Sequence, residues 1–201
     1  KHVYGRRPAQ DYRVTFKTIT ERDGLFGVDA VGRSMVVEIK AGSESHSFPM
    51  YVFMPTQATR GGVKSAGPFP AVVHINNRDF PSFEDVINVS DEFWPVQELV
   101  KRGFVACGIS TVTIDPDRAD GFDQGIRGMF HRAAGTNSSG DADADGEAWR
   151  ALSAWGWGAS RALDYLVTLP SVDASKIAVI GHSRGGKAAL WAAAEDPRFA
   201  I

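Results

Sequence analysis

Hydrophobic and polar residues alternate along three stretches in the first quarter of the chain, and this period of two predicts β-strands. The stretches are residues 12–19, 35–39 and 50–53. Clusters of turn-forming residues separate them, so we expect antiparallel β-structure between Asp11 and Pro55. A surface loop, 60–70, rich in glycine and proline, then leads to a buried strand at 71–75.

Predicted strands and helices alternate in the rest of the chain. The expected order is a helix at 93–102, a strand at 104–111, a long loop, a helix at 148–169, a strand at 176–181 and a last helix. This alternation implies right-handed crossovers and a parallel sheet with helices on both faces. We therefore expect residues 1–201 to be part of one α/β-hydrolase domain, a three-layer sandwich, with residues 199–201 at the start of another strand.

The predicted helix at 148–169 has an apolar face at helical spacing. Small side chains at Ala154, Gly158 and Ala162 follow at intervals of four, which lets the helix lie close to the sheet. Three tryptophans belong to this region, namely Trp149, Trp155 and Trp157. They could stack on a sugar ring, but packing in the core is the preferred interpretation.

Composition and charge exclude several classes of partner. The chain has 201 residues, 43% of them hydrophobic and 23% charged, with a formal net charge of -2 and a pI near 6.2. These values give no electrostatic case for nucleic acid or an anionic membrane, and no apolar run approaches the ~20 residues of a membrane-spanning helix. The single cysteine, Cys107, lies in an apolar run and is expected to be a buried, inert thiol.

The most informative motif is Gly181-His182-Ser183-Arg184-Gly185, which fits G-x-S-x-G at the end of an apolar strand. Strong helix-forming sequence follows it. In a nucleophile elbow the turn holds the serine in a strained conformation, and the flanking glycines let strand and helix approach each other. We therefore predict that Ser183 is a nucleophile; the alternative is a glycine-rich turn without chemistry.

Two basic residues accompany this serine. The N–H of Arg184 is expected to help to hold an oxyanion at the start of the helix, where the helix dipole favours negative charge. Its guanidinium could stabilise the same charge, although a solvated side chain is the alternative. Lys187 follows Ser183 by about one helical turn and could orient substrate hydroxyls; a Ser–Lys dyad is less favoured, because an elbow serine normally takes a histidine.

The remaining members of a catalytic triad are not found in the expected order. In α/β-hydrolases the acid and then the histidine follow the serine, but all five histidines precede Ser183. Only Glu195 and Asp196 supply carboxylates after it. We therefore expect the catalytic histidine and acid to lie outside these residues, in a larger polypeptide of which this chain is a part.

Residues 141–146, Asp-Ala-Asp-Ala-Asp-Gly, resemble the start of a calcium-binding EF-hand loop. Position 12 of such a loop would be Leu152 instead of glutamate, and no helix is expected before it. A solvated loop at the rim of a substrate pocket is therefore preferred, and no metal site is predicted.

The extended motif Gly181-His182-Ser183-Arg184-Gly185-Gly186-Lys187 resembles the G-C/H-S-R-x-G-K signature of glucuronoyl esterases, carbohydrate esterase family 15, in its bacterial form with histidine at the second position. Further stretches that resemble the family are residues 3–6, 94–103, 114–118 and 154–166. The resemblance thus extends over almost the whole chain.

The resemblance implies an activity, namely hydrolysis of the ester between 4-O-methyl-glucuronoyl groups of glucuronoxylan and lignin alcohols, through an acyl-enzyme and without metal or organic cofactor. It further implies that Ser183 is the nucleophile, that Arg184 stabilises the oxyanion and that Lys187 contacts glucuronoyl hydroxyls. A secreted or periplasmic location is also implied. Another esterase such as an acetylxylan esterase, a peptidase, and an inactive carbohydrate-binding homologue remain as alternatives.

Overall fold

The computed structural model describes residues 4–5, 10–60, 63–118, 122–135 and 149–201. Six strands form the main sheet, in the order β1-β2-β3-β7-β6-β8. Their bounds are Arg13–Asp23 for β1, Ala30–Ala41 for β2, Glu44–Pro55 for β3, Phe69–Asn76 for β6, Val105–Ser110 for β7 and Val172–Gly181 for β8. The strands β1, β2, β3 and β7 pair antiparallel, whereas β6 pairs parallel with both β7 and β8. The predicted change from antiparallel to parallel structure is confirmed.

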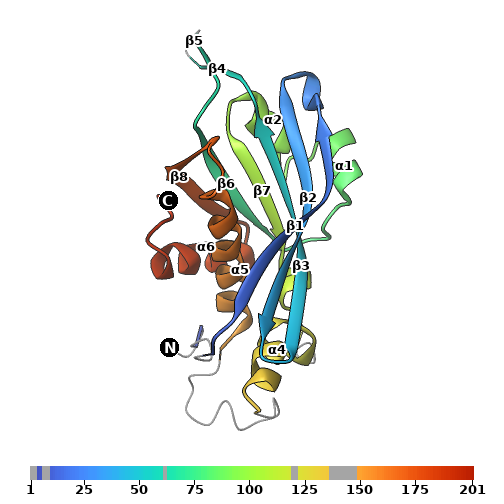
Figure 1. The fold of residues 1–201 in the computed structure, drawn as a ribbon, viewed down its shortest axis with the longest axis vertical. Helices are drawn as coiled ribbons and strands as arrows, with labels where there is room; N and C mark the ends of the chain where they lie inside the picture. Colours follow the sequence, from blue (N-terminus) through green and yellow to red (C-terminus); the bar gives the residue numbers. More distant parts are fainter. Residues whose placement is uncertain (1–3, 6–9, 61–62, 119–121, 136–148) are drawn as a thin grey trace.

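Helices cover both faces of this sheet (Figure 1). Helices α1 (Phe83–Asn88) and α2 (Val96–Lys101), with the short 3-10 helix η1 (Leu25–Gly27), lie on one face. Helices α4 (Ile126–Ala133), α5 (Ala151–Leu166) and α6 (Arg184–Glu195) lie on the other, and α5 and α6 are side by side. The result is the expected sandwich of three layers.

Alternation along the strands supplies each layer with its own core. On β3, Val52 faces the core under α5 and α6, whereas Phe53 faces the core under α1 and α2. The neighbouring strand β7 repeats this pattern with Cys107 and Ala106. Cys107 is fully buried as predicted, and its burial raises the pKa of the thiol well above its ordinary value.

Several predicted boundaries were wrong. The strands are longer than their alternating stretches because sheet partners continue the pairing, and α2 and α5 are shorter than the predicted helices. The predicted long loop after β7 contains helix α3 (Thr111–Ile114), the 3-10 helix η2 (Phe122–Gln124) and α4. The predicted surface loop at 60–70 contains part of a hairpin, β4 (Ala58–Arg60) and β5 (Val63–Ser65), as well as the start of β6.

The last residues of the chain lie along β8, although they do not form a regular strand. The N–H of Ala200 donates to the carbonyl of Ile177 at 2.8 Å, and the N–H of Val179 donates to the carbonyl of Ile201 at 2.9 Å. Within the described part of the chain, no helix has the length and apolar character needed to cross a bilayer; α5, with 16 residues, is the longest of them.

Candidate active site

The carboxyl ends of β6 and β8 form the topological switch point of the parallel part of the sheet. From β6 the chain continues into α1 and α2 on one face, whereas from the adjacent β8 it continues into α6 on the opposite face. The two connections therefore diverge above the strand ends, and in open α/β sheets the ligand-binding crevice lies at this position. Ser183 lies two residues after Gly181, the last residue of β8.

The backbone at Ser183 is strained, as the elbow prediction requires. Its φ of 53° and ψ of -116° lie in a region that non-glycine residues rarely adopt. Strand β8 ends at Gly181 and α6 begins at Arg184, so the whole reversal is made by two residues. The side chains of His182 and Ser183 are both exposed.

The flanking glycines are required by close backbone contacts. A Cβ atom on Gly181 would lie 2.4 Å from the carbonyl carbon of Gly185, and one on Gly185 would lie 2.8 Å from the carbonyl oxygen of Ile75 in β6. Both distances are far below van der Waals contact. The glycine spacing therefore follows from the contact of α6 with β6 and β8, as predicted.

Helix α6 presents its N-terminus to the crevice. The Ser183 side chain does not cap the helix, and the N–H of Lys187 donates to the Ser183 carbonyl at 3.2 Å, closing the first turn. The N–H groups of this first turn have no acceptor inside the helix, and the dipole makes this end positive. An oxyanion formed next to Ser183 would be stabilised there.

The guanidinium of Arg184 forms an ion pair with Asp117, a residue to which the sequence reasoning gave no role. Nη1 of Arg184 lies 2.5 Å from Oδ2 of Asp117. Asp117 follows α3 in the connection that leaves β7, so the pair joins two loops that flank the end of β6. The Arg184 side chain is 59% exposed as well as paired, so its role at the oxyanion and the alternative of a solvated side chain both stay predictions.

Asp115, two residues before Asp117, is an anchor for this loop. Its carboxylate is fully buried and pairs with Arg127 of α4, and its carbonyl accepts a 2.8 Å hydrogen bond from Nε1 of Trp155. Burial raises the pKa of Asp115 to about 6, although the Arg127 guanidinium opposes this shift. Gly125 leaves room for the carboxylate, because a Cβ atom there would lie 2.1 Å from Asp115 Oδ1.

The loop after β6 forms the other side of the crevice. Asn76 Oδ1 accepts the N–H of Arg78 at 2.8 Å, and the Arg78 guanidinium lies 3.9 Å from the centre of the Phe93 ring. The Phe93 ring in turn meets the His182 ring edge-on at 5.7 Å. In α/β-hydrolases a backbone N–H of the corresponding loop is the second donor to the oxyanion. The order of the predicted strands could have indicated the loop after β6 for this role, but the sequence analysis assigned it none.

Comparison with known proteins agrees with this geometry. A family model described as "Glucuronyl esterase, fungi" matches residues 143–201, which include α5, β8 and α6. The chain is 35% identical over 108 residues to the carbohydrate esterase MZ0003 of an unknown prokaryotic organism, covering 54% of this chain and 23% of that protein. It is 27% identical over 176 residues to a 4-O-methyl-glucuronoyl methylesterase of Neurospora crassa, covering 85% and 35%.

Among solved structures, the glucuronoyl esterase of Solibacter usitatus superposes with a TM-score of 0.77 at 28% identity over 98% of this chain. The chain is similar to glucuronoyl esterases of carbohydrate esterase family 15. It is the part of that α/β-hydrolase fold that extends through the helix after the elbow, and it spans 53% of the Solibacter esterase and less of the two curated relatives.

The three predicted site residues lie at the start of α6. Ser183 precedes the helix, Arg184 begins it and Lys187 follows one turn later. The Lys187 side chain is exposed, and within the described ranges no ion pair involves it. The structure thus brings the three residues together, while their chemical roles stay predictions.

His46 and His74, which both precede the elbow, do not have the surroundings of a catalytic base. Nε2 of His46 lies 2.9 Å from the Thr113 carbonyl. His74 on β6 is buried between Phe93 and Trp94, with ring centres at 5.2 and 5.9 Å. Burial lowers the pKa of His74 to about 4, against the opposing charge of Asp91. Neither ring is arranged like the base of an elbow serine.

The aspartate-rich motif at 141–146 lies outside the described residues, so its predicted role at the pocket rim stays a prediction. Within the described ranges, no group of three or more histidine, cysteine, aspartate or glutamate side chains is arranged to hold a metal ion.

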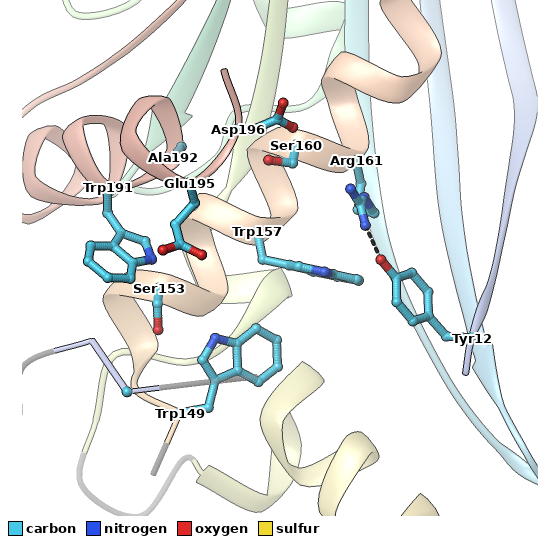
Figure 2. A pocket seen from close by; sticks show the side chains of 12 residues that line it. Tyr12, Trp149, Ser153, Trp157, Ser160, Arg161, Trp191, Ala192, Glu195 and Asp196 are labelled. Atoms are coloured by element: carbon cyan, nitrogen blue, oxygen red, sulfur yellow. Dashed lines mark hydrogen bonds between the residues drawn. The ribbon is translucent and has the colours of Figure 1, made fainter. Parts of the chain in front are cut away.

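A cavity of about 640 Å³ lies between α5, α6 and the start of the chain, where Gly5 and Tyr12 line it (Figure 2). Figure 2 shows Trp149, Trp157 and Trp191 around it, with Tyr12 accepting a hydrogen bond from Arg161. Helix α6 has 12 residues, or about 18 Å, so this cavity, next to its last turn, is remote from Ser183. The preference for core packing is confirmed for Trp149 and Trp155, which are buried, whereas Trp157 is partly exposed at the cavity.

Proposed function

We propose that the polypeptide that contains this chain is a serine esterase that hydrolyses 4-O-methyl-glucuronoyl esters linking glucuronoxylan to lignin alcohols. The observation that carries the proposal is the strained backbone of Ser183 at the switch point, with Arg184 and Lys187 in the first turn of the helix that follows it. A nucleophile with two cationic neighbours suits an ester whose acyl group is a hydroxylated sugar acid. The names of the relatives support this substrate class.

In the first step Ser183 Oγ attacks the ester carbonyl carbon while its proton passes to a base, which we expect after Ile201. The carbonyl oxygen becomes an oxyanion held by the N–H groups at the start of α6 and by the Arg184 guanidinium. The C–O bond to the alcohol then breaks, and the alcohol leaves with the proton from the base. Water attacks the acyl-enzyme, releasing the glucuronic acid and restoring the serine hydroxyl.

Lys187 would act on the acyl group and not on the reacting carbon. Its exposed ammonium, one turn beyond Ser183, can donate to the sugar hydroxyls and so orient the ester for attack. This assignment requires no metal or organic cofactor. Because xylan and lignin are polymers outside the cell, we also propose that the polypeptide is secreted or periplasmic.

A substrate panel tests the proposal. The polypeptide that contains this chain should cleave benzyl and methyl glucuronate, and replacement of Ser183 by alanine should abolish that turnover. Cleavage of simple acetyl esters without cleavage of glucuronate esters would assign the elbow to another hydrolase. Failure to cleave any ester, with retained binding of glucuronic acid, would identify an inactive carbohydrate-binding homologue.

A further inference from the structure

Among the described residues, the ion pair between Arg184 and Asp117 is a charged contact that the structure adds to the predicted site. We propose that Asp117 is a positioning residue, which orients the Arg184 guanidinium toward the oxyanion without touching the substrate itself. This inference rests on the proposed function, because it assigns a partner to the arginine of that mechanism. The contact is direct, with 2.5 Å between Arg184 Nη1 and Asp117 Oδ2.

The geometry of a guanidinium allows both contacts at once. Arginine has five N–H donors in a planar fork, and the recorded contact to Asp117 uses one nitrogen, Nη1. The other donors are left for an oxyanion or an ester oxygen. A long, 59% exposed side chain would otherwise sample many rotamers, and fixing it before the reaction removes this ordering cost from the transition state.

Asp117 can act in this way because contacts of the residues on either side of it restrain its loop. Pro116 restricts the backbone next to it, and the N–H of Arg118 closes a turn to the Pro116 carbonyl at 3.0 Å. Asp115 is fixed by its ion pair with Arg127, whose side chain is only 11% exposed, and by the 2.8 Å bond from Trp155. The carboxylate of Asp117 therefore projects from a rigid connection and not from a free loop.

Because the Arg184–Asp117 pair is exposed, an orienting role of Asp117 can be distinguished by experiment from a role in stability. The side chains of Arg184 and Asp117 are 59% and 31% exposed, and ion pairs in such surroundings contribute little to folding. Loss of the Asp117 carboxylate should therefore leave the melting temperature almost unchanged. If the residue orients Arg184, the loss should appear in turnover instead.

A double-mutant cycle on the polypeptide that contains this chain tests the inference. Asp117→Asn should lower kcat on benzyl glucuronate by about 10- to 100-fold with little change in KM, since a misplaced group of this kind costs up to roughly 10²-fold. Arg184→Gln should lower kcat at least as much. The double variant should be no slower than Arg184→Gln alone, because Asp117 has then lost the group that it orients. Asp117→Glu should restore part of the rate.

Asp173→Asn is the matched control. Like Asp117, Asp173 forms an ion pair with an exposed basic side chain, with 2.7 Å between Asp173 Oδ2 and Lys176 Nζ. This pair lies near the start of β8, away from the elbow. Its replacement should leave kcat unchanged. The inference is overturned if Asp117→Asn stays within about 2-fold of the unmodified rate, or if the losses in the double variant multiply. Should the polypeptide prefer acetyl esters, the same cycle can be measured on them, so that failure of the proposed function and failure of this inference are distinguishable.

Discussion

His74 offers the sharpest link between a buried group and a measurable property of this protein. The imidazole lies on β6, 2% exposed, between the rings of Phe93 and Trp94, and its Nδ1 has no partner among the described residues. Burial lowers the pKa of His74 to about 4, whereas an unfolded chain has the ordinary value of 6.5. We expect replacement of His74 by leucine to remove a loss of stability in weak acid.

The sign and the size follow from proton linkage. Between pH 6.5 and 4 the unfolded state binds a proton that the folded state does not, so stability is lost as the pH falls through this window. The two pKa values give a loss from His74 of about 2 kcal/mol between pH 8 and pH 5, and of about 3 kcal/mol well below pH 4. His74→Leu should also lose ring contacts, about 1 kcal/mol, equally at both pH values.

The measurement is urea unfolding of both proteins at pH 8 and at pH 5, followed by tryptophan fluorescence. The free energy of unfolding of His74→Leu, relative to the unmodified protein, should rise by about 2 kcal/mol from pH 8 to pH 5. Phe93→Leu is the packing control: it disturbs the same contacts but keeps the imidazole, so its stability difference should change with pH much less than that of His74→Leu. A His74→Leu difference that is constant with pH would refute the reasoning.

Three further variants test the elbow. Ser183→Ala should abolish turnover of glucuronate esters while sugar-acid binding, measured by calorimetry, is kept, because the exposed hydroxyl contributes no packing; unchanged turnover would remove Ser183 from the mechanism. Lys187→Ala should reduce kcat/KM for glucuronate esters much more than for simple esters, and an equal loss on both would make Lys187 structural. Gly185→Ala should destabilise the protein by about 1–3 kcal/mol, because its Cβ would meet the Ile75 carbonyl at 2.8 Å; an unchanged melting temperature would contradict that contact.

The elbow could be predicted from sequence because its requirements are local. The glycine spacing around Ser183 reflects contacts between a strand and the helix that directly follows it, and both elements have strong sequence patterns. The role of Asp117 could not be found in this way. It lies 67 positions before Arg184, and only the parallel order of β7, β6 and β8 places the two loops together.

Helix α4 shows an intermediate case. Its buried residues Ile126, Met129 and Phe130 follow the i, i+3, i+4 spacing of a helix, so the signal was present within a segment predicted to be a loop. Eight residues give barely two turns, too few for the pattern to stand out. Helix α1 also carried a signal, since Ser82 and Asp85 form a capping box. By contrast, the burial of Asp115 beside Arg127 depends on tertiary packing alone.

The bond from Trp155 to the Asp115 carbonyl joins the two ends of a crossover that are 40 positions apart in sequence. Once its ends are fixed, the entropy of a chain segment changes only slowly with its length, by about 0.6 kcal/mol for each doubling. The sequence between these anchors can therefore lengthen or shorten in evolution while the strand ends beneath it keep their places. For protein engineering, this crossover is the natural position for insertions that leave the sheet unchanged.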